Sequence, residues 1–258
     1  MSEPECPVGY ARKDEIALIR LDRPHRLNAV VPALVEGLVR ALERAREEDV
    51  RAAVLSGRGR AFCAGHDLKE EAERDGIEAA RARIDRIQDV TRAIRRSPFP
   101  VIAAVHGYAL GAGCEFALGC DLVVASADAR FGFPETTVGL SVTGGVSRLL
   151  TATLGPLKAK ELVLLGEQFD AADAARLGLV ARVVEPGLHE SAALELARAL
   201  AGKPQFALAL AKRALDAGLD SSLEDAFGRE TADALLTLAG TEADGGRDAF
   251  AAKEEGTR

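Results

Sequence analysis

The segment PVIAAVHGYALGAGCEFALGCDLVVAS, residues 100–126, most constrains what this chain can fold into. Its first eight residues form a continuous apolar run, short enough to be a strand buried on both faces. A helix is predicted over 112–120 and a second strand over 121–126. A helix between two buried strands predicts an α/β fold.

The rest of the chain extends this pattern. Strands are predicted over 15–24, 51–57 and 179–184, and helices over 32–48, 77–96, 156–166 and 171–177. We expect Asn28 to cap the helix over 32–48, and Ile84, Ile87, Thr91 and Ile94 to form the buried face of the helix over 77–96. Because the pattern is almost wholly helical from about residue 188, we predict an α/β domain over 1–190 and a helical region over 191–258.

Composition excludes several classes of protein. In 258 residues, 48% hydrophobic and 28% charged, a sizeable core is expected rather than disorder. No apolar run reaches the ~18–20 residues of a membrane helix, and the N-terminal residues lack a signal-peptide core, so we expect a cytoplasmic protein without a membrane partner. The net charge of −7 disfavours a nucleic-acid surface.

Known cofactor and metal motifs are missing from the sequence. It contains no dinucleotide-binding fingerprint, no G-x-S-x-G and no HExxH, and its four histidines show no metal-ligand spacing. The four cysteines lack zinc-finger spacing and are expected to be free thiols. We therefore expect neither a metal nor a cofactor.

Two turns rich in Gly and Ala, over 61–70 and 107–115, each follow a predicted strand. Small residues let the backbone approach a ligand, and a new helix offers unpaired N–H groups. Brought together, the turns could direct two N–H groups at one oxygen, as an oxyanion hole does. Tight packing alone is the simpler interpretation, and the residues by themselves leave both open.

Two glutamates, Glu115 and Glu135, stand among apolar residues and glycines. A helix, a strand and a return fit between them, so both could face one site. Such a pair suits acid/base addition of water, in which one carboxyl holds a proton while the other accepts one. The alternatives are a structural acid paired with an arginine for Glu115, and an exposed loop acid for Glu135.

The segments AFCAGHDLKE, HGYALGAGCEFALGCDLVVASADARFGFPE and AKELVLLGEQFDAADAARLGLVARVV resemble the enoyl-CoA hydratase/isomerase (crotonase) superfamily. The resemblance runs from RLDRPHRLNAV to the terminal RDAFAAKEEGTR. It implies a crotonase-like spiral of repeated ββα units, with C-terminal helices that support a homotrimer, commonly paired into a hexamer. It also implies an acyl-CoA substrate, whose coenzyme A is part of the substrate rather than a cofactor.

The resemblance also implies roles for individual residues. The N–H groups of His66 and Ala112 would form the oxyanion hole. Glu115 would orient and deprotonate the water that attacks C3, and Glu135 would deliver a proton to C2. The family's hydratases have both acids, whereas its isomerases often have one, so the pair favours an enoyl-CoA hydratase of fatty acid or related acyl-CoA metabolism.

Coenzyme A contacts are implied for Ala64, Asp67, Leu68 and Lys69, in addition to His66. Because the protein is net negative, local cations must hold the CoA phosphates, and Lys69 and Arg26 are the candidates.

Two positions depart from the family pattern. His66 stands where small or apolar residues are usual; its side chain is expected to be chemically silent, the alternative being contact with the acyl or pantetheine group. SVTGGVSRL (141–149) replaces a sequence resembling PGAGGTQRL, which puts the acyl-pocket wall and short-chain specificity in doubt. The rival functions are an enoyl-CoA isomerase, a hydroxyacyl-CoA dehydratase and, disfavoured by the net charge, an RNA-binding family member.

Overall fold

The computed structural model describes residues 6–68 and 76–240. The chain forms two compact units, Met1–Leu200 (unit 1) and Ala201–Arg258 (unit 2). The boundary predicted at residue 190 falls inside helix α6 (His189–Ala201).

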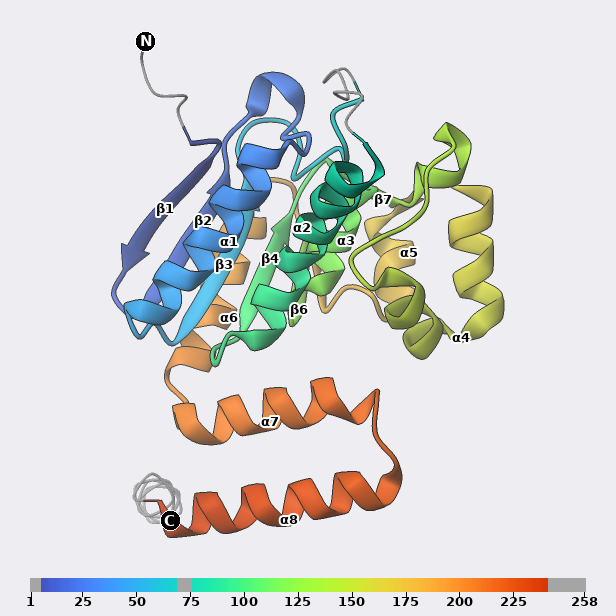
Figure 1. The fold of residues 1–258 in the computed structure, drawn as a ribbon. Coiled ribbons are helices and arrows are strands. Elements are labelled where there is room, and N and C mark those ends of the chain that lie inside the picture. Colours follow the sequence, from blue (N-terminus) through green and yellow to red (C-terminus); the bar gives the residue numbers. More distant parts are fainter. Residues whose placement is uncertain (1–5, 69–75, 241–258) are drawn as a thin grey trace. The chain divides into compact units, whose positions relative to one another are not determined.

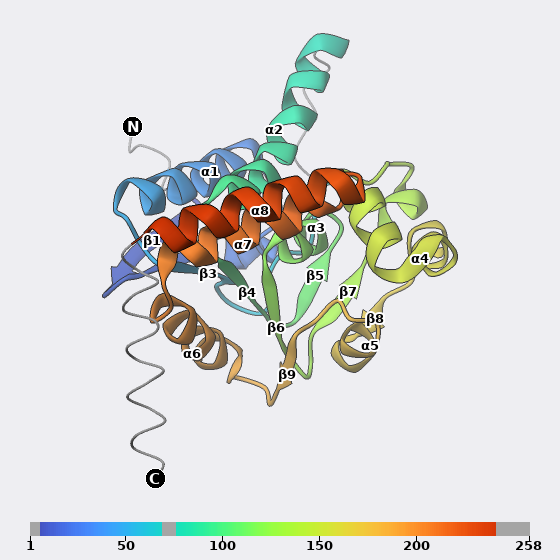
Figure 2. The same cartoon turned by 90° about the horizontal axis from the view of Figure 1, so that it is seen from below.

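A six-stranded sheet in the order β1-β2-β3-β4-β6-β9 is the centre of unit 1. Its first two strands pair antiparallel and the others pair parallel. Helices α1 and α2 cover one face and α6 the other (Figures 1 and 2), so the apolar runs in β3 and β4 are buried throughout. The strands are β1 (Val8–Lys13), β2 (Ile16–Leu21), β3 (Ala52–Gly57), β4 (Val101–Val105), β6 (Leu122–Ser126) and β9 (Arg182–Val184).

A second sheet joins three short strands, β5 (Tyr108–Leu110), β7 (Arg130–Gly132) and β8 (Phe169–Asp170). Strand β5 pairs parallel with β7, and β7 pairs antiparallel with β8. The remaining short elements of unit 1 are η1 (Pro24–Arg26), α3 (Ala112–Gly119), η2 (Pro134–Val138) and α5 (Ala171–Arg176). The α/β prediction is confirmed.

The longer helices refine the sequence-based predictions. Helix α1 (Pro32–Glu47) matches its predicted span, but its N-cap is Val31, so the prediction that Asn28 caps it was wrong. Helix α2 (Ile77–Arg96) buries three of its four predicted residues, whereas Ile84 is 46% exposed.

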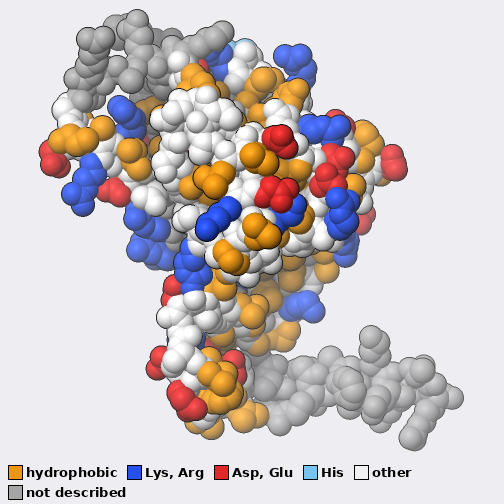
Figure 3. Space-filling model, turned by 90° about the vertical axis from the view of Figure 1, so that its right-hand side faces the viewer, with side chains coloured by type: hydrophobic (Ala, Val, Ile, Leu, Met, Phe, Trp, Pro, Cys, Tyr) orange, Lys and Arg blue, Asp and Glu red, His pale blue; other side chains and the backbone are white. Residues whose placement is uncertain are grey.

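Helix α4 (Val146–Leu165) begins ten residues before the predicted helix at 156. Gly155 interrupts it with a non-helical backbone before Pro156, so the predicted helix is its second half. The side of unit 1 that carries α4 shows apolar side chains scattered among charged ones (Figure 3).

Unit 2 contains two helices, α7 (Gln205–Gly218) and α8 (Leu223–Ala239). Ser222 and Asp225 form a capping box at the start of α8. An ion pair at 2.6 Å joins Arg213 of α7 to Asp233 of α8. None of the helices in the described residues is long and apolar enough to cross a membrane.

Candidate active site

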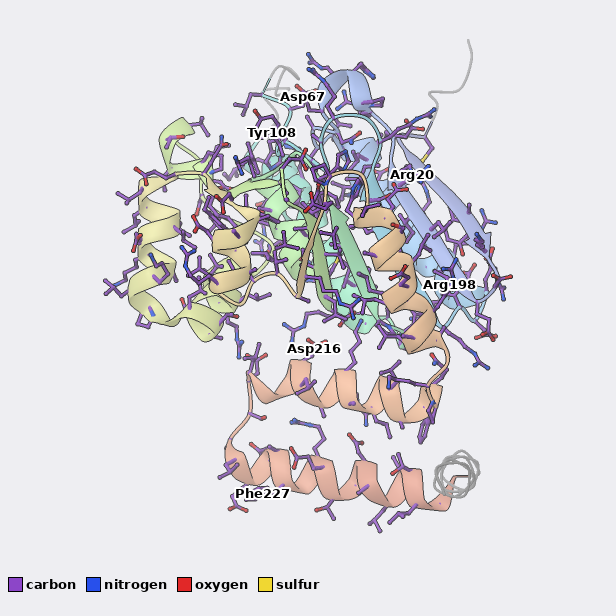
Figure 4. All side chains as sticks on the ribbon, turned by 180° about the vertical axis from the view of Figure 1, so that it is seen from behind. Arg20, Asp67, Tyr108, Arg198, Asp216 and Phe227 are labelled. Atoms are coloured by element: carbon purple, nitrogen blue, oxygen red, sulfur yellow. The ribbon has the colours of Figure 1, made fainter. Side chains whose placement is uncertain are left out.

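The chain segments that follow β3 and β4 run side by side. The N–H of Cys63 donates to the Tyr108 carbonyl at 2.9 Å, and the N–H of Leu110 donates to the Cys63 carbonyl at 3.0 Å. A Cβ atom at Gly113 would lie 2.2 Å from the Cys63 oxygen, so only glycine permits this approach. Asp67 and Tyr108, one from each segment, lie at the same end of the sheet (Figure 4). The two glycine-rich turns predicted from the sequence therefore meet.

The amides proposed for the oxyanion hole follow the point where the turns touch. A Cβ atom at Gly65 would lie 3.7 Å from the Cα of Gly111, so the two glycines are close neighbours. The N–H of Asp67 donates to the Val30 carbonyl at 3.1 Å, and the N–H of Val30 donates to the Gly65 carbonyl at 2.8 Å. In this parallel bridge the N–H of His66, between them, points away from Val30. Ala112 is the first residue of α3, where an N–H has no partner within its helix. Neither the N–H of His66 nor that of Ala112 donates to an acceptor among the described residues.

Asn28 holds the first turn in place. Its side-chain amide lies within hydrogen-bond distance of three carbonyls at 2.8–3.1 Å: that of Arg58, just before the turn, and those of Ala61 and Phe62 within it. Its Oδ1 accepts from the N–H of Arg23 at 2.8 Å. Asn28 is fully buried with a left-handed φ of 55°, a conformation that asparagine tolerates better than most residues. These bonds occupy the side chain that we had expected at the helix terminus.

Glu115 lies in the first turn of α3 and is 2% exposed. Burial raises its pKa, and two hydrogen bonds from Thr143 oppose that effect. The Thr143 N–H donates to Oε1 and the hydroxyl to Oε2, each at 2.6 Å. The carboxylate form is therefore buried but hydrogen-bonded.

Glu135 lies in η2 and is 6% exposed. A Cβ atom at Gly111 would lie 3.1 Å from its Oε1, which places this carboxyl beside the second turn. Its Oε2 is buried and has no hydrogen-bond partner in the described part of the chain. Burial raises the pKa of Glu135 to about 7, its own backbone N–H opposes the rise, and the charge of Glu115 adds to it.

The two carboxyls therefore have different surroundings. Glu115 accepts two hydrogen bonds from Thr143, whereas Oε2 of Glu135 is buried without a donor among the described residues. Hydrogen bonds to an ionised form favour that form, so the two donors from Thr143 favour the carboxylate of Glu115, whereas burial favours the protonated form of Glu135. Such a difference is the arrangement that gives one acid and one base near neutral pH.

The residues predicted to contact a ligand lie around the first turn. Ala64 is half-buried, and the side chains of His66 and Leu68 are exposed. Asp67 accepts from Arg23 and Arg26 with ion-pair distances of 3.3 and 3.1 Å.

Lys69 lies outside the described residues. The pKa of His66 lies below its ordinary value, mainly through loss of hydration and secondly through the charge of Arg83. Both effects favour the neutral imidazole.

Metal and thiol chemistry both depend on how His, Cys, Asp and Glu side chains are placed. No group of three or more His, Cys, Asp or Glu side chains there could hold a metal ion. Cys63 and Cys114 are buried free thiols, and burial raises the pKa of both, that of Cys63 to about 12. A thiol with such a pKa is not a nucleophile at neutral pH.

The sequence matches the pattern of the enoyl-CoA hydratase/isomerase family over residues 11–256. It is 38% identical to the 2,3-dehydroadipyl-CoA hydratase of Escherichia coli K12, over 85% of this chain and 86% of that one. It is 33% identical to the short-chain-enoyl-CoA hydratase of Clostridium acetobutylicum, over 87% and 86% of the two chains.

Solved structures give the same result for the fold. An enoyl-CoA hydratase from Geobacillus kaustophilus superposes with a TM-score of 0.89 at 38% identity, covering 96% of this chain and 95% of that one. An enoyl-CoA hydratase from Mycobacterium smegmatis superposes with a TM-score of 0.90 at 35% identity, covering 97% of each. The fold is the crotonase fold.

Proposed function

The chain belongs to the enoyl-CoA hydratase/isomerase family, and we infer from this that it is an enoyl-CoA hydratase. It is a hydro-lyase, adding water across the 2,3 double bond of a 2-enoyl-CoA thioester to give a 3-hydroxyacyl-CoA. The observation that supports hydration most directly is the buried pair of unlike carboxyls, Glu115 and Glu135. Addition of water needs a base and an acid at once.

The N–H groups of His66 and Ala112 would bind the thioester carbonyl oxygen. Negative charge develops on that oxygen as the enolate forms, and fixed N–H donors stabilise it without reorganisation. One such donor is typically worth ~10²–10³ in rate. Ala112 adds the positive end of the α3 dipole.

Glu115 would be the base for water and Glu135 the acid. With Thr143 donating to both of its oxygens, Glu115 is the carboxyl better able to ionise and to orient a water toward C3. With a pKa of about 7, Glu135 still holds a proton near neutral pH and can deliver it to C2. After the step Glu115 holds the proton from water and Glu135 has lost its own, and proton exchange with solvent returns Glu115 to the carboxylate and Glu135 to the acid.

The first turn would bind the coenzyme A part of the substrate, so no separate cofactor is needed. Backbone and side chains of Ala64, Asp67, Leu68 and Lys69 would contact it, with Arg26 as a further cation. Arg23 and Arg26 both pair with Asp67, so these three described side chains together carry one formal positive charge, which favours an anionic ligand.

Assembly and location complete the proposal. The helices of unit 2 expose large apolar side chains, more than a solvated pair of helices needs: Phe206, Leu215, Leu219, Leu223, Phe227, Leu235, Leu236 and Leu238. Homotrimers, alone or stacked in pairs as hexamers, would cover them in a cytoplasmic enzyme that uses no nucleic-acid partner. Light scattering tests this: an active particle of about 27 kDa, the mass of one chain, would contradict it.

Absorbance of the conjugated thioester tests the activity. We expect crotonyl-CoA, or a longer or aromatic 2-enoyl-CoA, to lose this absorbance when the enzyme is added. In ¹⁸O-labelled water the product should carry the label at C3. An isomerase would instead generate the absorbance from a 3-enoyl-CoA without label. That result would replace hydration by isomerisation, and inactivity toward every thioester would refute both.

A further inference from the structure

Thr143, in the loop between η2 and α4, directs both of its hydrogen-bond donors at one carboxyl group. Its N–H donates to Oε1 of Glu115 and its hydroxyl to Oε2, each at 2.6 Å. One donor on each oxygen fixes the rotation of the carboxyl plane. An ionised carboxylate has about four acceptor positions, so two remain for a water molecule.

The backbone around Thr143 is itself held against Glu115. The N–H of Val146 donates to the Thr143 carbonyl at 3.1 Å, closing a turn that leads into α4. A Cβ atom at Gly144 would lie 3.1 Å from Cβ and 3.2 Å from Oε2 of Glu115. The turn therefore packs directly on the carboxyl, and Thr143 has little freedom to move away from it.

The other carboxyl of the site has no comparable support. Oε2 of Glu135 is buried without a partner in the described residues, although the two glutamates lie close enough for the charge of one to act on the other. The two acids thus differ in their donors: Thr143 directs two at Glu115, whereas the donor that acts on Glu135 is its own backbone N–H.

We propose that Thr143 is a positioning residue: through its hydroxyl and its amide it fixes the orientation of Glu115 and selects Glu115, rather than Glu135, as the ionised base of the pair. The assignment of Glu115 as base to water rests on the proposed hydratase function. The hydrogen-bond pattern and its effect on ionisation do not. Both donors of Thr143 are directed at Glu115, so its proposed action is exerted through that carboxyl.

Three substitutions distinguish the effect of the Thr143 hydroxyl from an effect on folding. Thr143→Val keeps the shape and the N–H but removes the hydroxyl, and Thr143→Ser restores a hydroxyl. Thr151→Val is the matched control, because the Thr151 hydroxyl donates to the Ser147 carbonyl within α4 and to no carboxylate among the described residues. Circular dichroism verifies that each variant is folded.

The direct readout is titration of Glu115 by ¹³C NMR with labelled glutamate carboxyls, the Glu115 signal being assigned from Glu115→Gln. In the pH range of the titration, Glu135 is the described neighbour whose charge couples to it, because the adjacent Cys114 thiol has a pKa raised above its ordinary value. We expect Thr143→Val to raise the Glu115 midpoint by about one to two pH units, the size of one hydrogen bond to a charged group. Thr143→Ser and Thr151→Val should stay within about half a unit of wild type.

Kinetics give the second readout. Thr143→Val should lower kcat about tenfold, leave KM for the enoyl-CoA within about twofold, and move the acidic limb of the pH profile upward, as expected for an effect on chemistry rather than on binding. An unchanged Glu115 titration in folded Thr143→Val would overturn the proposal, as would failure of Thr143→Ser to restore the wild-type titration. If the wild type hydrated no enoyl-CoA but the titration shifted as expected, the hydratase function would be refuted and the positioning role supported.

Discussion

Replacement of Glu135 by glutamine should stabilise the protein at neutral and alkaline pH but not at acidic pH. The ordinary pKa of this carboxyl is 4.5, and in the folded protein it is about 7. Between these values the folded protein keeps the proton that the unfolded chain releases, so stability falls as pH rises. The loss is absent below about pH 4 and complete above about pH 7.

The size of this loss in the free energy of unfolding follows from the difference between the two pKa values of Glu135. About 2.5 pH units at 1.36 kcal/mol per unit give about 3 kcal/mol of lost stability at pH 8. The neutral amide of Glu135→Gln avoids this cost, but its NH₂ group must find a partner in the pocket where Oε2 has none. We therefore expect a net gain of roughly 1–3 kcal/mol at pH 8 and almost none at pH 4.

Urea unfolding followed by circular dichroism measures this difference. All proteins are compared at one protomer concentration, because association adds to apparent stability. Glu167→Gln is the matched control: it makes the same change of charge at an exposed position in unit 1, and its stability should be unchanged. A Glu135→Gln variant no more stable than wild type at pH 8, or equally stabilised at pH 4, would refute a protonated, buried Glu135.

Three more substitutions test the site. Asn28→Ala should cost about 3 kcal/mol in urea unfolding, because it leaves buried carbonyls and an N–H without partners; a loss below about 1 kcal/mol would contradict its anchoring role. His66→Ala should keep kcat within about tenfold, because alanine still presents the N–H, whereas a loss above ~10²-fold in a folded variant would show that the imidazole takes part. Gly111→Ala should lower kcat more than tenfold, since its Cβ would press on Glu135 at a φ of 53°; wild-type kcat would contradict the contact.

The sequence predicted those features of the fold that depend on a local pattern of apolar and polar residues. The apolar runs of β3 and β4, the helices after them and the helical C-terminal region all have a clear period or length. The burial of Glu115 was predicted from its apolar neighbours, and the carboxyl is 2% exposed.

Features set by distant partners were not predictable in this way. The strands of the second sheet are only two or three residues long, and their pairing joins segments far apart in the chain. Asn28 was interpreted as a helix cap because the same residue type serves both purposes, and only the fold brings three carbonyls to its amide. Thr143 lies in a loop whose sequence does not indicate that Glu115, 28 residues earlier, is its partner.

The most direct test of the central claim is the kcat for hydration of a 2-enoyl-CoA by wild type, Glu115→Ala and Glu135→Ala, followed by loss of the thioester absorbance. The two-carboxyl account predicts that each substitution lowers kcat by at least ~10²-fold, the contribution of a general acid or base, while circular dichroism stays unchanged. A folded variant of either residue that hydrates the substrate at the wild-type rate would contradict the account and remove that carboxyl from the mechanism.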